Sequence, residues 1–156
     1  MQKRWQTILW TGLAFGVFIL LRFVVFDIYR IRGQSMAPSL ADGTIVLVMR
    51  STFSPALSPG MLVMARTKKD SLVKRVLALG PALVEWTERG IRVDGRPVVS
   101  YTNAQTVPLP GNTIVKKNMV FLIGDNPEES IDSRTFGAID EKNILGQVIL
   151  SFKPFW

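Results

Sequence analysis

Three short stretches of the chain carry side chains whose types and spacing could perform chemistry. Residues 33–40 read Gly-Gln-Ser-Met-Ala-Pro-Ser-Leu, which places Ser35 between a glycine and a proline. Residues 71–77 hold a lysine and an arginine among aliphatic side chains, and residues 124–134 gather small polar residues, carboxylates and an arginine. A serine hydroxyl becomes a strong nucleophile only when a base takes its proton during attack. The chemistry of Ser35 therefore depends on which base the chain can supply.

The choice of base is narrow because the chain contains no histidine and no cysteine. The first absence excludes a Ser-His-Asp triad, a histidine general base and most catalytic zinc sites. The second excludes disulfides and thiolate metal sites. Acid–base work near neutral pH must then fall to a lysine or to a carboxylate with a shifted pKa. We expect a site that uses neither a metal nor a cofactor.

Lys74 and Arg75 lie in a stretch that is typical of a β-strand, where alternation places them on opposite faces. An ammonium group on the apolar face of a sheet is costly, and burial lowers a lysine pKa until the proton is lost. Arginine cannot lose its proton and must find an acid. The pattern therefore indicates Lys74 as a neutral base and Arg75 as an ion-pair member. Two solvated bases at a sheet edge are the alternative interpretation.

Residues 124–134 follow the apolar run 119–123, so they begin where a strand gives way to a loop. Small polar residues, carboxylates and an arginine at this spacing could form a hydrogen-bonded, charge-paired platform. A solvated acidic turn is the alternative interpretation.

Residues 8–26 form the only long apolar run of the chain. As a helix rising about 1.5 Å per residue, the run spans roughly 28 Å, close to the ~30 Å hydrocarbon core of a bilayer. It is longer than a typical signal-peptide core, and no small-x-small cleavage pattern follows it, which favours a retained anchor. We therefore expect a short N-terminal tail, a transmembrane anchor and one folded domain, assigned to residues 1–6, 7–27 and 28–156.

Charge gives a weaker indication of how the anchor is oriented and what the chain contacts. Lys3 and Arg4 on one side of the apolar run oppose Arg22, Arg30 and Arg32 on the other, so the positive-inside count does not decide the orientation. A short N-terminal tail favours the N-terminus inside. The net charge of +7 comes from scattered bases, which suits anionic lipid head groups better than nucleic acid. We expect the lipid bilayer as a partner and no nucleic acid.

The remainder of the chain is typical of a mainly β domain, folded as a sandwich or a partial barrel. Short apolar runs are separated by Gly and Pro turns at residues 45–49, 61–65, 71–79, 83–87, 91–93, 97–101, 119–123 and 147–152. Residues 100–117 are polar and contain proline, which predicts an exposed loop or hairpin. The aromatic residues of 152–156, with Phe53, suit a domain that rests on a membrane; a frayed strand end is the alternative.

In this order, behind a single anchor, the three stretches resemble the type I signal peptidases, membrane-anchored Ser/Lys endopeptidases that remove signal peptides from exported proteins. The resemblance covers nearly the whole chain and rests on Ser-Met-x-Pro-Ser-Leu at 35–40, Lys-Arg-Val at 74–76 and Gly-Asp-Asn…Ser-x-Asp-Ser-Arg at 124–134. It implies preproteins bearing signal peptides as substrates. It also implies a single-pass plasma (inner) membrane protein with a cytoplasmic N-terminus and an extracytoplasmic catalytic domain.

Two other functions remain open on the sequence. One is a dedicated peptidase of the same family, which processes pilin or conjugation subunits or works in the mitochondrial inner membrane. The other is a non-catalytic, membrane-anchored assembly factor, which the presence of all three stretches disfavours.

The resemblance also implies a role for each matching residue. Ser35 corresponds to the acyl-forming nucleophile, Lys74 to the general base and Ser130 to a second hydroxyl that orients the lysine. The supporting ion pairs that it implies are Asp132 with Arg134 and Asp125 with Arg75.

Substrate contacts are implied less directly. Many family members carry a serine oxyanion donor at the position of Gly33, so here the oxyanion is expected to rest on the backbone N–H of Ser35, with Gly33 as a further candidate. The walls of shallow pockets for small side chains map onto Ile31, Met36, Leu40 and Val73. Met36 and Leu40 are equally consistent with ordinary core positions.

Overall fold

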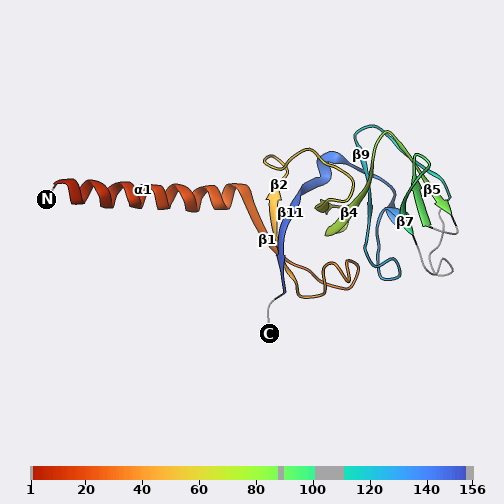
Figure 1. Ribbon diagram of the computed structural model, residues 1–156, viewed down its shortest axis with the longest axis horizontal. Helices are drawn as coiled ribbons and strands as arrows, with labels where there is room; N and C mark the ends of the chain where they lie inside the picture. Colours follow the sequence, from red (N-terminus) through yellow and green to blue (C-terminus); the bar gives the residue numbers. More distant parts are fainter. Residues whose placement is uncertain (1, 88–89, 101–110, 154–156) are drawn as a thin grey trace.

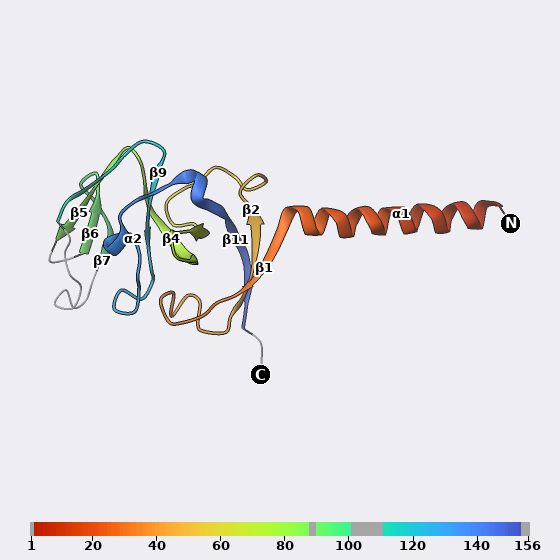
Figure 2. The ribbon, with the colours of Figure 1, turned by 180° about the vertical axis from the view of Figure 1, so that it is seen from behind.

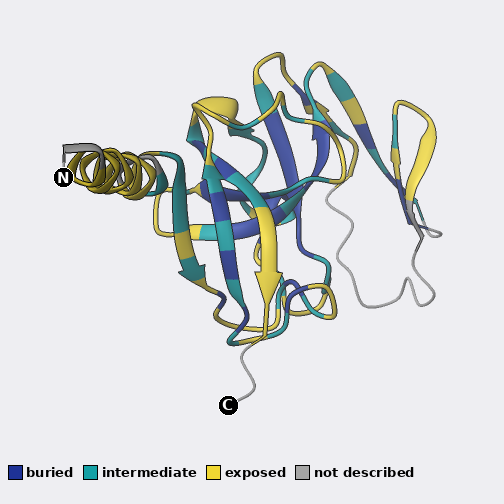
Figure 3. Ribbon diagram, turned by 60° about the vertical axis from the view of Figure 1, so that its left-hand side comes forward, coloured by how far each residue is buried: buried dark blue, intermediate teal, exposed yellow. Residues whose placement is uncertain are grey.

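The N-terminal apolar run forms one long helix that leaves the rest of the molecule. A computed structural model of the chain describes residues 2–87, 90–100 and 111–153. Helix α1 (Gln2–Val25) projects from one end of a β domain, and its residues 4–19, 23 and 24 are exposed (Figures 1 and 3). Its segment Arg4–Val25 has a mean hydropathy of 2.2 and no buried share, and is long enough to cross a membrane. A core helix of a soluble protein would be covered by neighbours, and this helix is not.

The helix passes into the β domain without a linker. Strand β1 (Phe26–Arg30) begins directly after Val25, so it includes the last two residues of the segment assigned to the anchor from sequence. Arg22 donates a hydrogen bond to the Phe26 carbonyl at 3.0 Å, which satisfies an acceptor just past the helix end. Asp27 and Arg50 then form an ion pair across β1 and β2, with Arg50 Nε 2.9 Å from Asp27 Oδ2.

The main sheet has seven strands in the order β1-β2-β11-β3-β4-β9-β10, and neighbouring strands are antiparallel. The C-terminal strand β11 therefore lies between two strands of the N-terminal half. The bounds of the strands after β1 are β2 (Ile45–Arg50), β3 (Leu62–Arg66), β4 (Ser71–Leu79), β9 (Met119–Ile123), β10 (Ile139–Asp140) and β11 (Ile144–Phe152). Helix α2 (Ser133–Phe136) and the 3-10 turn η2 (Glu141–Asn143) complete this part.

A smaller sheet covers the end of the domain that is distant from α1 (Figures 1 and 2). Its order is β7-β6-β5-β8, with bounds β5 (Ala82–Thr87), β6 (Gly90–Val93), β7 (Arg96–Ser100) and β8 (Thr113–Val115). The two-residue turn between β6 and β7 uses positive φ angles at Asp94 (50°) and Gly95 (76°), as a tight hairpin requires. The rings of Trp86 and Phe121, 6.1 Å apart, join the two sheets through one apolar cluster.

The mainly β fold class with one N-terminal apolar helix is confirmed, and the main sheet is curled. Each of the eight predicted runs overlaps an observed strand. The prediction of a loop or hairpin over 100–117 is wrong in part, because β8 pairs with β5 and its Val115 is fully buried. Residues 101–110 of that segment lie outside the described residues, as do Phe155 and Trp156 of the chain end.

Strands β1, β2 and β11 lie nearest α1, and the rest of the domain is on their other side (Figures 1 and 2). Their inward residues, such as Val46 and Val48, belong to the core. By register, the outward side of these strands carries Arg30, Gln147 and a group of apolar residues, and we call this apolar group the anchor-side face. Its members are Phe26, Ile28, Ile45, Leu47, Met49, Leu150 and Phe152; of these Ile28, Leu150 and Phe152 are more than half exposed.

Candidate active site

Ser35 lies on the loop that connects β1 to β2. We call residues 31–44 the nucleophile loop. Its two ends are joined by backbone hydrogen bonds from Ile31 N–H to the Thr44 carbonyl (2.8 Å) and from Gly43 N–H to the Ile31 carbonyl (3.0 Å). Met36 and Leu40, each 1% exposed, hold the middle of the loop in an apolar cluster beneath it.

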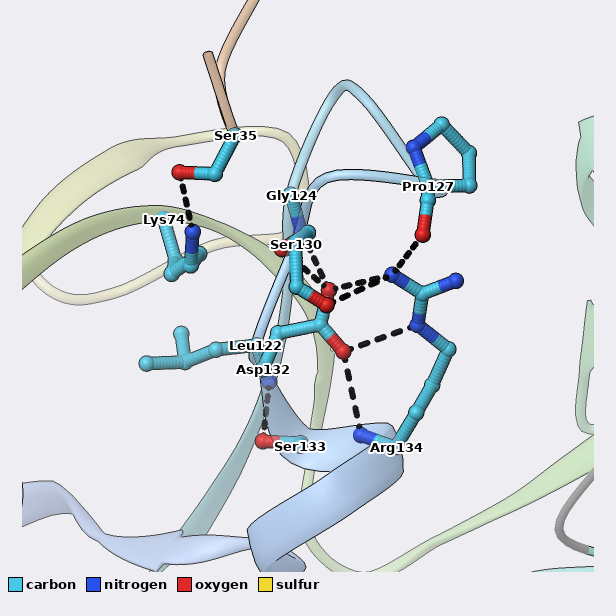
Figure 4. Close-up of polar contacts among 9 residues, drawn as sticks. All are labelled: Ser35, Lys74, Leu122, Gly124, Pro127, Ser130, Asp132, Ser133 and Arg134. Carbon is cyan, nitrogen blue, oxygen red and sulfur yellow. Dashed lines mark hydrogen bonds and ion pairs between the residues drawn. The ribbon is translucent and has the colours of Figure 1, made fainter. Parts of the chain in front are cut away.

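The second chemical residue, Lys74, comes to Ser35 from the middle of the main sheet. Lys74 Nζ lies 2.6 Å from Ser35 Oγ (Figure 4). Strand β4 carries Lys74 between strands β3 and β9, opposite the fully buried Val63, and the lysine is only 3% exposed. Burial lowers the pKa of Lys74 below its ordinary 10.5, although the negative charge of Asp132 acts in the opposite direction. A buried neutral amine at this distance can accept the hydroxyl proton of Ser35.

Asp132 is the centre of the platform formed by residues 124–134 (Figure 4). Its Oδ1 accepts from the Arg134 backbone N–H (3.1 Å) and Nε (2.8 Å). Its Oδ2 accepts from Gly124 N–H (2.9 Å), Ser130 Oγ (2.7 Å) and Arg134 Nη2 (2.8 Å). Burial alone would raise the pKa of Asp132, but the hydrogen bonds from Arg134, Gly124 and Ser130 outweigh it and hold the pKa below its ordinary value.

Contrary to the expectation from sequence, the Ser130 hydroxyl is not hydrogen-bonded to Lys74. Its hydroxyl donates to Asp132, and among the described residues Ser35 is the only hydrogen-bond partner of the Lys74 side chain. An ionised carboxylate is a stronger acceptor than a neutral amine, which accounts for the difference. Ser130 is nevertheless part of the same site, because a Cβ atom at Gly124 would collide with Ser130 Oγ and would lie 2.6 Å from the Ser35 carbonyl oxygen. Only glycine allows this close approach.

Arg75 and Asp125 form the other ion pair, on the face of β4 opposite Lys74. Arg75 Nε and Nη2 lie 2.7 and 2.6 Å from the two carboxylate oxygens of Asp125. The same guanidinium donates to the Gly60 carbonyl (2.7 Å) and, at 3.4 Å, to Ser39 Oγ in the nucleophile loop. Burial would raise the pKa of Asp125, but its hydrogen bonds with Arg75 keep that pKa below its ordinary value. The pair thus connects β4 to three loops around Ser35.

The residues mapped as pocket walls all lie in one cluster next to Ser35, but they differ in access. Met36 and Leu40 are core residues, because each is 1% exposed and offers no surface to a ligand. Ile31 and Val73 retain 8% and 7% of their surface and are the two that remain as candidate walls.

The tentative oxyanion role of Gly33 is not supported by its geometry. Its N–H donates to Asp42 Oδ1 at 2.7 Å, so this amide is already used. The N–H of Ser35 has no hydrogen-bond partner within the described residues, and it remains the candidate donor.

Three contributors were missed in the sequence. Asn126 donates its N–H to the Ser35 carbonyl at 3.1 Å, which joins the platform to the nucleophile loop. The buried Ser133 hydroxyl accepts from Leu122 N–H at 2.9 Å and fixes the platform on β9. Asp42 was visible only as half of an Asp-Gly turn. Asn126 and Ser133 both lie in the stretch 124–134, which the sequence singled out. The contact of Asn126, however, is made by its backbone N–H, and a backbone contact cannot be inferred from residue type.

Comparison with known proteins places this chain in a family. A family model described as "Signal peptidase, peptidase S26" matches residues 4–153. Signal peptidase IB of Staphylococcus aureus is 33% identical over 89% of this chain and 83% of its own length. Signal peptidase I of Bacillus caldolyticus is 29% identical over 86% and 84%.

A solved structure is similar in fold. The crystal structure of a signal peptidase I from Enterococcus faecalis has a TM-score of 0.53 and 17% identity, over 60% of this chain and 97% of that chain. Because the sequence match extends over almost the whole length, the chain belongs to the type I signal peptidase family, peptidase S26.

Proposed function

We propose that the chain is a membrane-anchored serine endopeptidase that removes N-terminal signal peptides from exported preproteins, with Ser35 as nucleophile and Lys74 as general base. The observation that carries this proposal is the 2.6 Å contact between Ser35 Oγ and the buried Lys74 Nζ. Burial supplies what lysine needs to act as a base near neutral pH, namely a lowered pKa.

The reaction follows from these two side chains. Neutral Lys74 takes the Ser35 proton while Oγ bonds to the scissile carbonyl carbon, and the N–H of Ser35 donates to the developing oxyanion. The ammonium then gives the proton to the leaving amine as the C–N bond breaks. Water, deprotonated by Lys74, hydrolyses the resulting acyl-enzyme. The substrate binds as an extended strand, with small side chains near Ile31 and Val73.

The pH dependence of precursor cleavage tests this role of Lys74. Only the neutral amine is a base, so kcat should rise with pH through the lowered pKa of Lys74 and reach a plateau below 10.5. The measurement is a pH–rate profile on a purified preprotein, with the full chain in detergent and its folding checked by circular dichroism at each pH. A rising limb centred near 10.5, or a flat profile, would contradict the proposal.

The relatives are named as signal peptidases. This supports a general role in preprotein processing over a role dedicated to pilin or conjugation subunits. The intact Ser35–Lys74 contact argues against a non-catalytic assembly factor. Turnover of a general preprotein and of a pilin-type subunit, assayed side by side, separates the two peptidase roles.

The bilayer is the second partner in this proposal. The anchor-side face lies on the side of the domain from which α1 projects (Figures 1 and 2). A helix that crosses the bilayer would bring this apolar surface to the membrane, where its exposed Ile28, Leu150 and Phe152 lose contact with water. We place the N-terminal tail in the cytoplasm and the β domain on the extracytoplasmic side of the plasma membrane.

Spin labels can test this placement because the chain has no cysteine of its own. Leu150→Cys labels the anchor-side face, and Ile114→Cys, 75% exposed on β8 of the small sheet, is the matched control. With the full chain in vesicles, we expect the label at 150 to be more accessible to oxygen than to a polar nickel complex, and the label at 114 to show the reverse. Equal, water-like accessibility at both positions would place the face away from the membrane.

A further inference from the structure

The nucleophile loop is packed against the core on the C-terminal side of Ser35 but not on the N-terminal side. On the C-terminal side, Met36 and Leu40 are buried in the core. On the N-terminal side, residues 32–34 are exposed, so no packing fixes them. This arm must be held by hydrogen bonds, or the backbone leading into Ser35 is free to move.

One side chain holds this arm. Gly33, two residues before the nucleophile, donates its N–H to Asp42 Oδ1 at 2.7 Å. Of the described hydrogen bonds that join two residues of the nucleophile loop, this is the only one that involves a side chain. It is also the shortest of them. Gly33 has a φ of +85°, a conformation that few other residues adopt, so the bond fixes an otherwise permissive position.

The contact between Gly33 and Asp42 requires an acceptor oxygen and does not require the negative charge of Asp42. Asp42 is exposed, and within the described part of the chain it forms no ion pair, although the Arg30 guanidinium lies over the neighbouring Gly43. An acceptor oxygen at this position is therefore sufficient, and an amide oxygen can replace the carboxylate.

We propose that Asp42 is a positioning residue of the reaction: by holding the N–H of Gly33, it fixes the backbone that presents the Ser35 hydroxyl and the Ser35 N–H. This inference rests on the proposed function of Ser35. A nucleophile and an oxyanion donor contribute most when they are in place before the transition state forms, and a small misplacement costs as much as about 100-fold in rate. Asp42 does not touch the substrate, so its loss affects kcat and leaves KM nearly unchanged.

The variants Asp42→Ala and Asp42→Asn separate the acceptor from the charge. Asp94→Ala is the matched control, because Asp94 also precedes a glycine in a turn, is also exposed, and accepts an N–H bond from Leu83 at 2.8 Å in the small sheet. For the full chain in detergent we expect Asp42→Ala to lower kcat for preprotein cleavage by roughly 10- to 100-fold with little change in KM. Asp42→Asn and Asp94→Ala should keep wild-type kcat.

Hydrogen exchange gives a readout that does not depend on catalysis. The amide of Gly33 should exchange faster in Asp42→Ala than in the wild type or in Asp42→Asn, while the rising limb of the pH–rate profile stays at the same pH. Wild-type kcat in Asp42→Ala, or an equal loss in Asp42→Asn, would overturn the inference. Ser35→Ala is assayed alongside: if it still cleaves, the proposed function fails, whereas an inactive Ser35→Ala beside a fully active Asp42→Ala refutes only the role of Asp42.

Discussion

Ser35→Ala and Lys74→Ala are each expected to lower kcat for preprotein cleavage by about four orders of magnitude or more. Without the hydroxyl no acyl-enzyme can form, and without the amine no described group lies within hydrogen-bond distance to take the proton from Ser35 Oγ. The two residues act as one unit, so the double variant should lose no more than the worse single variant. The measurement is turnover of a purified preprotein by the full chain in detergent.

Two further lysine variants test whether the loss of activity in Lys74→Ala is caused by the loss of the Lys74 amine. Lys142→Ala removes an exposed lysine and should keep full activity. Lys74→Met keeps the size of the side chain but not its amine, and it should be inactive yet at least as stable as the wild type. Because the folded pKa of Lys74 lies below 10.5, protonation opposes folding, so the stability gained in Lys74→Met should be largest at low pH and should vanish as the pH approaches 10.5. Substantial cleavage by Lys74→Met would refute the role of the lysine.

Asp132→Ala is expected to cause the largest loss of stability, about 3–5 kcal/mol in the free energy of unfolding. The Asp132 side chain is fully buried and that of Arg134 is 8% exposed, so the variant removes one partner of a buried ion pair. It also removes the acceptor of Gly124 N–H and of the Ser130 hydroxyl.

The chain contains a matched control for this ion pair. Asp140 and Lys142 have the same two-residue spacing as Asp132 and Arg134, but their side chains are 51% and 78% exposed. Asp140→Ala should therefore cost only about 0–1 kcal/mol. Denaturant unfolding of both variants, followed by tryptophan fluorescence in detergent, gives the comparison. Similar losses of unfolding free energy in Asp132→Ala and Asp140→Ala would show that Asp132 does not stabilise the platform of residues 124–134.

Strands formed by distinct apolar runs between clear turns were predicted well from the sequence. The predicted bounds of β4 and β9 agree with the structure. Strand β1 was missed because its first residue continues the apolar run of the anchor, and β8 because it is only three residues long, with two adjacent apolar residues, Ile114 and Val115. Local patterns could not show that β11 inserts between β2 and β3, since these pairings join residues 79 to 107 positions apart along the chain.

The sequence indicated which candidate residues would lie near one another, but not all of their contacts. Motif spacing identified Ser35 and Lys74, which the sheet brings to 2.6 Å across 39 positions of sequence. Residue type cannot say which of two nearby acceptors a hydroxyl selects, so the choice of Asp132 by Ser130 required coordinates. The same holds for Gly33, whose amide is used by Asp42.

The crowded carboxylate of Asp132 has a consequence for the route that protons take through the site. A carboxylate offers about four lone-pair positions, and that of Asp132 accepts five hydrogen bonds. These bonds hold the pKa of Asp132 below its ordinary value, and Ser130 is not hydrogen-bonded to Lys74, so the described residues offer no hydrogen-bonded path that would carry a proton from Lys74 to Asp132. A proton removed from Ser35 can leave Lys74 only toward the departing amine or toward solvent. In the proposed mechanism Lys74 is then the single proton carrier, and each turnover must return it to its neutral form before the next begins.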